Sequence, residues 1–380
     1  MNRRILVIIP YEVTIGFAFS RLIGVFFDAC VQVTGSPENV HFAFSAVGEQ
    51  GSTALPSWFS NLVEFNSRAY QDQDVQRLCA YIKRHGIETA FIVDVGVEAG
   101  YLRNIRSAGI KTIIAYWGAP LSQINQGLKL FLKQLEVKYL RSAKPDHFIV
   151  ESQAMRDTAI LGRGISPSMI TIVPTGVDDA RFRPLPEYRR LVYERFNIPP
   201  TRFIVVFMGH LHRRKGVHVL LQAADRIVKE HKRTDMHFLF LGNQPEEVDT
   251  FHGTYDLVAT GPFITFGGYH ADVPELLAGC HVGCIPTTGW DSFPLSPLEM
   301  QACGLPVVVS NCQGLPESVV NEVTGLVVPA GDVMALSSAL QRLVDEKELR
   351  TAMSEKAVQW IRLSFTRSRQ VAGVCEVIAN

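Results

Sequence analysis

The residues best suited to bind an anion lie in the segment 209–216, whose sequence is GHLHRRKG. This segment follows the apolar run Phe203–Met208 and precedes a pattern typical of an amphipathic helix that begins near Val217. Glycines allow the backbone to turn sharply and to approach a ligand closely. The unpaired N–H groups at a helix start attract negative charge, and three consecutive cations strengthen that attraction. The segment therefore predicts a loop that binds a phosphate or diphosphate, although a merely solvated basic loop would have the same composition.

A second segment, residues 291–299 with the sequence DSFPLSPLE, places two carboxylates near the start of a short predicted helix. Ser296 as N-cap, Pro297 at the first helical position and Glu299 two residues later would form a capping box, which explains Glu299 without a ligand. Alternatively, the same helix start faces a ligand. The amides of residues 293–295 would then bind phosphate or sugar oxygens, and Glu299 would accept hydrogen bonds from a ribose diol.

A third segment, residues 313–317 with the sequence QGLPE, contains a further glycine at which the backbone could approach a ligand. Pro316 and Glu317 suit the first turn of a helix. A dinucleotide-binding oxidoreductase is disfavoured, because no Gly-x-Gly-x-x-Gly follows the first apolar run, and the loop at 209–216 lacks the spacing of a P-loop.

The elements that must position these segments are short apolar runs that alternate with amphipathic helical patterns. The runs are mostly Val, Ile and Phe without clean alternation, which is typical of parallel strands buried on both faces. The predicted strands are Ile5–Ile9, Ala90–Val93, Thr112–Ala115, His147–Val150, Met169–Val173, Phe203–Met208, His237–Leu241, Phe263–Phe266, Val282–Ile285, Val307–Val309 and Leu326–Val328. Helical stripes occupy Val217–His231 and Val333–Glu346. This alternation predicts a doubly wound α/β fold.

The length of 380 residues predicts two domains. Prolines interrupt the chain between residues 182 and 200, so we place the boundary near Asp178 and Asp179. The expected domains are residues 1–178 and 179–362, and we expect the tail from about residue 363 to 380 to pack on the first domain. Two α/β domains that face a cleft bind ligands at the carboxyl ends of their strands.

Together these segments resemble the family 4 glycosyltransferases, also called glycosyl transferases group 1, which are retaining enzymes of the GT-B fold with two Rossmann-like domains. The resemblance covers nearly all of the second half of the chain. In the first half it rests on the strand–helix rhythm and on Phe148–Ser152. The motifs that carry the resemblance, in chain order, are Pro174–Asp178, Phe182–Pro184, Gly209–Gly216, Asp291–Glu299, Ala302–Val309 and Gly314–Asp332.

The resemblance implies a metal-independent transfer of a sugar, hexosyltransferase-like, from a nucleotide diphosphate sugar to a glycan, lipid or small-molecule acceptor held mainly by the first domain. Lys215 and Arg214 would stabilise the departing diphosphate, Asp291 would face the transferred sugar, and Glu299 would hold the ribose. The implied donor-binding residues are Gly209, His210, Arg213, Lys215, Phe293, Pro294, Leu295, Glu299 and Gly314. Such enzymes serve polysaccharide or glycolipid synthesis, and no cofactor or metal is implied.

The sequence departs from the family pattern at three points. Asp291 stands where glutamate is usual, and His210 stands where arginine is usual. In the first half, Tyr116–Pro120 occupies the position of the usual histidine. In that half we assign acceptor or phosphate contacts to Gly16 and Trp117, although Gly16 also suits an ordinary tight turn. These departures leave open a different class of function, a catalytically silent nucleotide-sugar-binding subunit.

The composition excludes several other classes. The chain has 37 basic and 37 acidic residues, so bulk positive charge for coating nucleic acid is absent. The seven cysteines show no zinc-ligand spacing or disulfide pattern. No apolar stretch is long enough for a membrane span, and we expect a cytoplasmic protein. Asp72-Gln73-Asp74 resembles a metal-binding DxD motif, but Asp74 also suits the N-cap of a helix over Val75–Arg84.

The segment 127–144 combines Leu128, Leu132, Leu135, Val137 and Leu140 with five cations, and its single acid is Glu136. A basic amphipathic helix of this kind could lie on the inner, anionic face of a membrane. The alternative is an ordinary helix whose apolar face packs on the sheet of the first domain and whose basic face is solvated.

Overall fold

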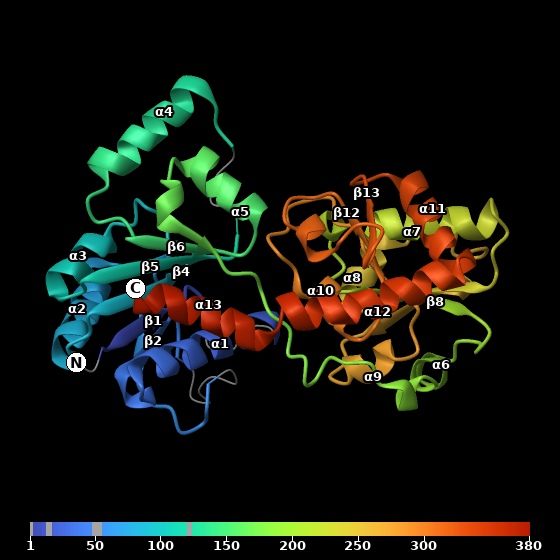
Figure 1. The fold of residues 1–380 in the computed structure, drawn as a ribbon, viewed down its shortest axis with the longest axis horizontal. Helices are drawn as coiled ribbons and strands as arrows, with labels where there is room; N and C mark the ends of the chain where they lie inside the picture. The colour runs from blue at the N-terminus through green and yellow to red at the C-terminus, as the bar shows by residue number, and fades with distance from the viewer. Residues whose placement is uncertain (1–2, 13–16, 48–54, 120–123) are drawn as a thin grey trace. The chain divides into compact units, whose positions relative to one another are not determined.

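The computed structural model describes residues 3–12, 17–47, 55–119 and 124–380. The chain divides into two compact units, coloured in Figure 1 from blue at the N-terminus to red at the C-terminus. Unit 1 comprises residues 1–174 and 368–380, and unit 2 comprises residues 175–367. The chain thus leaves unit 1 after Pro174 rather than near Asp178, and it returns at Ser368 rather than near residue 363.

Unit 1 is built on a parallel sheet with the strand order β3-β2-β1-β4-β5-β6-β7 among its described residues. The strands are β1 (Ile5–Ile8), β2 (Val40–Phe44), β3 (Leu62–Glu64), β4 (Thr89–Val93), β5 (Thr112–Trp117), β6 (His147–Val150) and β7 (Ile170–Ile172). The order reverses between β1 and β4, and the carboxyl ends of the strands beside such a reversal form the usual ligand-binding edge of a doubly wound sheet.

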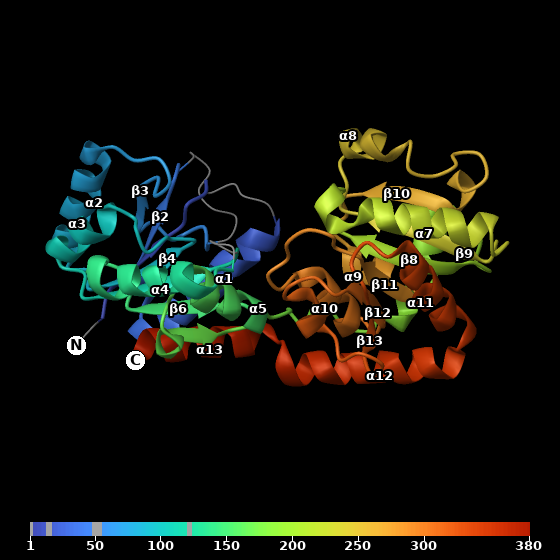
Figure 2. The same cartoon turned by 90° about the horizontal axis from the view of Figure 1, so that it is seen from above.

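Helices cover both faces of this sheet. The helices are α1 (Phe17–Thr34), α2 (Asp72–His85), α3 (Tyr101–Ala108), α4 (Gly127–Leu135), α5 (Gln153–Asp157) and α13 (Arg367–Ala379), with the π-helical turns η2 (Glu136–Leu140) and η3 (Thr158–Gly162) and the 3₁₀ turns η1 (Pro37–Asn39) and η4 (Pro167–Met169). Alternate residues of β1 enter different core clusters. Leu6 and Ile8 pack with α2, α3 and α5, whereas Ile5 and Val7 pack with α1 and α13. Helices α2 and α3 lie side by side (Figure 2).

Unit 2 repeats this plan with the strand order β10-β9-β8-β11-β12-β13. Its strands are β8 (Phe203–Met208), β9 (Met236–Leu241), β10 (Ile264–Gly268), β11 (Val282–Ile285), β12 (Val307–Ser310) and β13 (Gly325–Val328). Its helices are α6 (Leu191–Phe196), α7 (Val217–Lys229), α8 (Pro245–Val248), α9 (Val273–Leu277), α10 (Leu295–Ala302), α11 (Val333–Asp345) and α12 (Lys347–Ser364), with the 3₁₀ turns η5 (Pro186–Tyr188), η6 (Arg213–Lys215), η7 (Asp249–Phe251), η8 (Gly261–Phe263) and η9 (Leu315–Ser318).

The predicted doubly wound α/β fold is confirmed, and every predicted strand is present within a few residues of its expected bounds. Two strands of unit 1, β2 and β3, were not predicted. Strand β2 contains His41, which is 2% exposed because its ring packs inward and its Nδ1 lies 2.9 Å from the Tyr81 hydroxyl. A buried histidine interrupts the apolar pattern, and β3 is three residues long.

The last helix, α13, completes the core of unit 1. Val371, Val374 and Ile378 are buried in the same cluster as β1, and Gly373 lies against Val173. A Cβ at Gly373 would come within 3.0 Å of the Val173 side chain, so this contact favours glycine.

Asp74 is not the N-cap of its helix, contrary to the prediction from the sequence. Helix α2 begins at Asp72 and its N-cap is Gln71, while Asp74 is the third helical residue, where its Oδ2 accepts the Gln71 N–H at 2.8 Å. Asp74 therefore caps the helix from inside the first turn.

Within the described residues, no helix is long and apolar enough to cross a membrane, and the seven cysteines are free thiols.

Candidate active site

The predicted anion-binding loop lies between β8 and α7, at the carboxyl end of the central strand of unit 2. Arg213, Arg214 and Lys215 form the turn η6, and Gly216 ends it with a φ of 75°. A Cβ at Gly216 would fall 1.7 Å from the carbonyl oxygen of Pro286, which follows β11. The loop can thus pack on the end of β11 only because residue 216 has no side chain.

Backbone hydrogen bonds join this loop to the segment 287–291. The carbonyl oxygen of Arg214 accepts the N–H groups of Thr288 and Gly289 at 2.8 and 2.9 Å. The Thr288 hydroxyl donates to the carbonyl oxygen of Arg213 at 3.1 Å. These bonds bring the cations of the first motif to the first carboxylate of the second.

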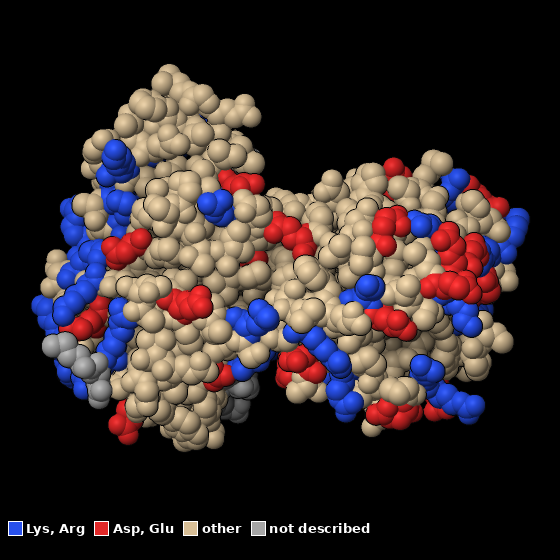
Figure 3. Space-filling model, viewed as in Figure 1, with Lys and Arg blue, Asp and Glu red and all other residues tan. Residues whose placement is uncertain are grey.

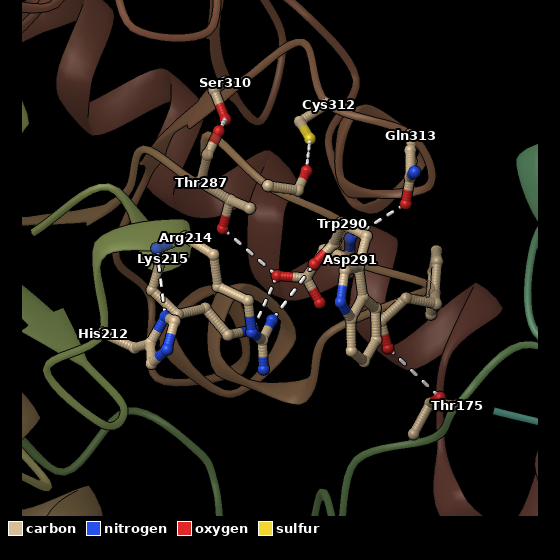
Figure 4. A network of polar contacts seen from close by, with 12 residues as sticks. Thr175, His212, Arg214, Lys215, Thr287, Trp290, Asp291, Ser310, Cys312 and Gln313 are labelled. Carbon is tan, nitrogen blue, oxygen red and sulfur yellow. Dashed lines mark hydrogen bonds and ion pairs between the residues drawn. The ribbon is translucent and has the colours of Figure 1, made fainter. Parts of the chain in front are cut away.

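Lys215 and Asp291 form an ion pair at the centre of this arrangement (Figure 4). The Lys215 Nζ lies 2.7 Å from Oδ2 of Asp291, and the Thr287 hydroxyl donates to the same oxygen at 3.2 Å. The Asp291 side chain is 7% exposed and that of Lys215 is 22% exposed. A carboxylate so deeply buried needs a compensating cation, so the pair fixes the place of the lysine ammonium as well.

The third motif holds the backbone on either side of the Asp291 carboxylate. The Asp291 N–H donates to Oε1 of Gln313 at 3.1 Å, and the Gly314 N–H donates to the Asp291 carbonyl at 3.1 Å. Gln313 adopts a positive φ of 48°, a conformation uncommon for residues other than glycine. All three motifs therefore converge on Asp291.

Arg214 turns toward the neighbouring tryptophan (Figure 4). Its Nη1 donates to the Trp290 carbonyl at 3.1 Å, and its guanidinium lies 4.4 Å from the centre of the Trp290 ring. The Trp290 side chain remains 41% exposed. The site thus presents an aromatic ring backed by a cation beside the ion pair.

The predicted capping box around Glu299 is wrong. Helix α10 begins at Leu295 with Pro294 as N-cap, so Ser296 lies inside the first turn and Glu299 is the fifth helical residue. Although it does not cap the helix, Glu299 is buried, with 7% of its surface exposed.

Phe293, just before the helix, is 3% exposed and packs on Phe365 with ring centres 5.2 Å apart. The Phe293 carbonyl accepts the Thr175 hydroxyl at 3.3 Å.

The first residues of the basic loop contact Gly242, which follows β9, and helix α8. Gly209 has a φ of 141°, and its backbone lies against Gly242. His210 is exposed, and its Nδ1 lies 3.3 Å from Oε1 of Glu247. Glu247 also accepts the Leu211 N–H at 3.2 Å and so ties the loop to α8.

In unit 1, the side chain of Trp117 lies in the core rather than on a ligand-binding surface. It is 1% exposed, it packs on Phe148, and its Nε1 donates to the Val95 carbonyl at 2.9 Å. Any contact of Trp117 with an acceptor would have to come from its backbone. Gly16 lies outside the described residues.

The carboxyl ends of the central strands in unit 1 carry a buried carboxylate instead of a basic loop. Asp94 follows β4, and its Oδ1 accepts the Gly118 N–H at 3.1 Å. Its Oδ2 accepts the Tyr11 hydroxyl at 3.1 Å and lies 3.6 Å from the Arg68 guanidinium. Burial raises the pKa of Asp94 above its ordinary value, against the opposing effect of these hydrogen bonds and of Arg68. Nearby, the buried Tyr116 hydroxyl donates to Oε1 of Glu151 at 2.7 Å.

Thr287, Trp290 and Gln313 complete the surroundings of Lys215 and Asp291, but the sequence analysis gave none of them a role, although Gln313 begins the third segment. Trp290 could have been noticed as the neighbour of Asp291. The sequence alone does not give the contacts of Thr287 and Gln313 with Asp291, because they depend on how the loops after β11 and β12 fold. Among the described residues, no group of three or more His, Cys, Asp and Glu side chains is arranged to hold a metal ion.

Comparisons with known proteins agree with this geometry. A glycosyltransferase from Rickettsia africae superposes on the chain with a TM-score of 0.80 at 16% identity, covering 99% of this chain and 98% of that one. Anabaena Alr3699/HepE, solved in complex with UDP, superposes with a TM-score of 0.79 at 15% identity and covers 99% of each chain. The two doubly wound units thus define a GT-B fold.

The family follows from the sequence of unit 2. Residues 191–360 match the family described as "Glycosyl transferases group 1", and unit 2 belongs to that family. A D-inositol 3-phosphate glycosyltransferase of Corynebacterium kroppenstedtii is 27% identical over 219 residues, which are 56% of this chain and 48% of that protein. A UDP-Gal:alpha-D-GlcNAc-diphosphoundecaprenol alpha-1,3-galactosyltransferase of Escherichia coli is 27% identical over 185 residues, 49% of this chain and 48% of that protein. The chain spans about half the length of these curated relatives.

Proposed function

We propose that the protein is a retaining glycosyltransferase that moves a sugar from a nucleotide diphosphate sugar to an acceptor without a metal ion. The observation that carries the proposal is the ion pair of Lys215 and Asp291 beside the start of α7. An ammonium held at 2.7 Å from a buried carboxylate, next to the positive end of a helix, suits the charge of a diphosphate.

Lys215 and Arg214 would stabilise the diphosphate as it leaves. The bond between the anomeric carbon and the diphosphate oxygen breaks, and its electron pair stays on the diphosphate. The acceptor oxygen bonds to the anomeric carbon on the same face, and its proton passes to the departing phosphate oxygen. Preorganised cations aimed at the developing charge typically supply about 10²–10³ in rate for each donor group.

The remaining roles follow from the positions of the carboxylates. Asp291 would hold Lys215 in place and face the transferred sugar, and the buried Glu299 would hold the ribose of the nucleotide. The amides near Leu295 and Gly314 would surround the sugar and the phosphates. The Escherichia coli relative is named for UDP-Gal, and Anabaena Alr3699/HepE was solved with UDP, which supports a uridine nucleotide as the first donor to test.

The experiment incubates the protein with a panel of nucleotide sugars and acceptors, with and without EDTA, and follows nucleotide release. The anomeric configuration of the product, read from its proton coupling in NMR, tests retention. We expect transfer that EDTA leaves unchanged and that Lys215→Ala abolishes, while Lys356→Ala on the exposed side of α12 has no effect. Tight donor binding without turnover for any pair would instead indicate a silent nucleotide-sugar-binding subunit.

A further inference from the structure

Helix α4 and the turn η2 leave an apolar stripe uncovered in unit 1. Within these two elements, all of whose residues are described, Val137 alone is buried. The exposed apolar side chains follow the spacing of one helix face. They are Leu128 (71% exposed), Phe131 (53%), Leu132 (55%), Leu135 (36%), Tyr139 (66%) and Leu140 (74%). The expectation that this apolar face packs on the sheet is therefore wrong.

Helix α4 is fixed to the rest of unit 1 by contacts with Gly162 and Gly164, near its own start and end. The apolar stripe is not part of these contacts and stays exposed. Gly164, with a φ of 74°, lies so close to α4 that a Cβ would come within 2.6 Å of the Gln134 nitrogen. Just before α4, Asn125 donates from its Nδ2 to the Gly162 carbonyl at 2.7 Å. These contacts hold α4 away from the strands of the sheet (Figure 1).

The stripe is flanked by cations. Glu136 is the one acid among residues 127–144, and Lys133 and Arg141 pair with it at 3.0 and 2.5 Å. Lys129 and Lys138 are exposed, and the Lys138 ammonium lies 5.1 Å from the centre of the Tyr139 ring. On the face shown in Figure 3, the lobe formed by α4 has an uncharged top and a basic side chain near its base.

We propose that this apolar and basic face docks on the surface of an anionic lipid bilayer. Monomeric proteins rarely expose a contiguous apolar patch of this kind without a binding role. The stripe is made of leucine, phenylalanine and tyrosine and is flanked by exposed lysines, a composition typical of a helix that lies on an anionic lipid surface. The flanking lysines would meet lipid phosphates while their stems lie along the acyl boundary. The segment is too short to span a bilayer and would lie in the interface.

Docking on a bilayer also bears on the acceptor. If the proposed glycosyl transfer is correct, an enzyme held at the membrane would favour an acceptor with a lipid anchor, presented at the same surface. This consequence depends on the proposed function, whereas the docking itself depends on the exposed face of α4.

The test is flotation of the full chain with vesicles of neutral phosphatidylcholine, or of the same lipid with an anionic phosphatidylglycerol fraction. We expect binding to the anionic vesicles that falls at high salt. The double variants Leu128→Gln/Leu132→Gln and Lys129→Glu/Lys138→Glu should each weaken binding at least about tenfold. Because all four side chains are exposed, these variants should keep the melting temperature of the parent protein. The matched controls Leu363→Gln and Lys356→Glu, on exposed positions of α12, should bind as the parent does.

Three results would overturn the proposal: no binding to anionic vesicles, binding that the stripe variants leave unchanged, or a dimer in solution that the stripe variants dissociate while vesicles are not bound. Donor binding, measured without lipid, separates this proposal from the glycosyltransferase proposal. The stripe variants should keep it, whereas Lys215→Ala should lose it and still float with vesicles.

Discussion

The two units share the order of their first six strands but differ in the charge that the loops at corresponding strand ends carry. In unit 2, the central strand β8 leads into three consecutive cations, of which Lys215 pairs with Asp291 in the loop after β11. In unit 1, the corresponding strand β1 leads to Tyr11, and β4 leads to the buried Asp94. The topology thus fixes where a ligand can approach each sheet, while the loop residues decide the charge that it meets.

This difference indicates a division of labour. Unit 2 is suited to an anion, because its carboxylate is already neutralised by Lys215. In unit 1, by contrast, the carboxylates and tyrosine hydroxyls at the strand ends are hydrogen-bonded to one another, and the cation nearest to Asp94 is Arg68. Matched substitutions in the two units test this difference.

The largest effect is expected at the cation of unit 2. Lys215→Met should lower the transfer rate by about 10³-fold, because the departing diphosphate loses its nearest fixed charge. It should also lower the free energy of unfolding by about 3–5 kcal/mol, because Asp291 stays buried without a partner. Arg68→Met, which removes the cation near Asp94, should change the rate less than about threefold, since the Arg68 side chain is 53% exposed and its guanidinium lies 3.6 Å from Asp94.

Steady-state kinetics and chemical denaturation measure both effects. The double variant Lys215→Met/Asp291→Asn should regain most of the lost stability and none of the activity. If Arg68→Met proves as damaging as Lys215→Met, the proposed difference between the units is wrong.

A matched pair of glycines gives the next largest effect. Gly216→Ala should lower the free energy of unfolding by about 3 kcal/mol and weaken donor binding, because the residue has a positive φ and its Cβ would overlap the Pro286 carbonyl. Gly118→Ala in unit 1 should cost less than about 1 kcal/mol, since its Cβ would lie 3.6 Å or more from its neighbours. Urea denaturation and donor titration check this pair, and equal costs would contradict the packing described for the basic loop.

Acid should destabilise unit 2 more steeply than unit 1. Burial, together with nearby arginines, lowers the pKa of His237 and His281 in unit 2 to about 4. In unit 1, burial with help from His85 and Arg4 lowers the pKa of His41 to about 4. These histidines are neutral when folded and gain a proton on unfolding, so stability falls as the pH drops from about 6.5 to 4. The raised pKa of Asp94 acts in the opposite direction in unit 1.

The expected slopes are about 2.7 kcal/mol per pH unit for the two histidines of unit 2 and about half of that for His41 in unit 1. Urea titrations read by tryptophan fluorescence can separate the units. A Trp290→Phe/Trp360→Phe variant reports on unit 1, and a Trp58→Phe/Trp117→Phe variant reports on unit 2. Equal slopes would show that the buried histidines do not dominate the acid response.

The smallest effect concerns the exposed aromatic ring beside the site. Trp290→Leu should weaken donor binding by about two- to fivefold, because Arg214 loses a cation–π contact worth about 0.5–1 kcal/mol and moves more freely. Trp58→Leu in unit 1, where the ring is 64% exposed, is the matched control and should leave donor binding unchanged. Isothermal titration with the donor nucleotide distinguishes the two.

The sequence predicted the fold of unit 2 more fully than that of unit 1. The apolar runs predicted all six strands of unit 2, including β9 with its buried His237, whereas β2 and the three-residue β3 of unit 1 were not predicted. Lys215, Asp291 and Gly314 come from the three motifs that the sequence analysis singled out, and they are in contact in the structure. The hydrogen bonds of Thr287 and Gln313 to Asp291 depend on how the loops fold. The capping box at Ser296 failed because α10 starts earlier than the motif suggested, at Leu295.

The return of residues 368–380 to unit 1 has a consequence for biosynthesis. Domains usually fold in the order in which they leave the ribosome. Here the core of unit 1 lacks Val371, Val374 and Ile378 until the last segment has been made, whereas residues 175–367 form an uninterrupted unit. Unit 1 therefore cannot complete its core until residues 368–380 are available, although most of it is synthesised before unit 2.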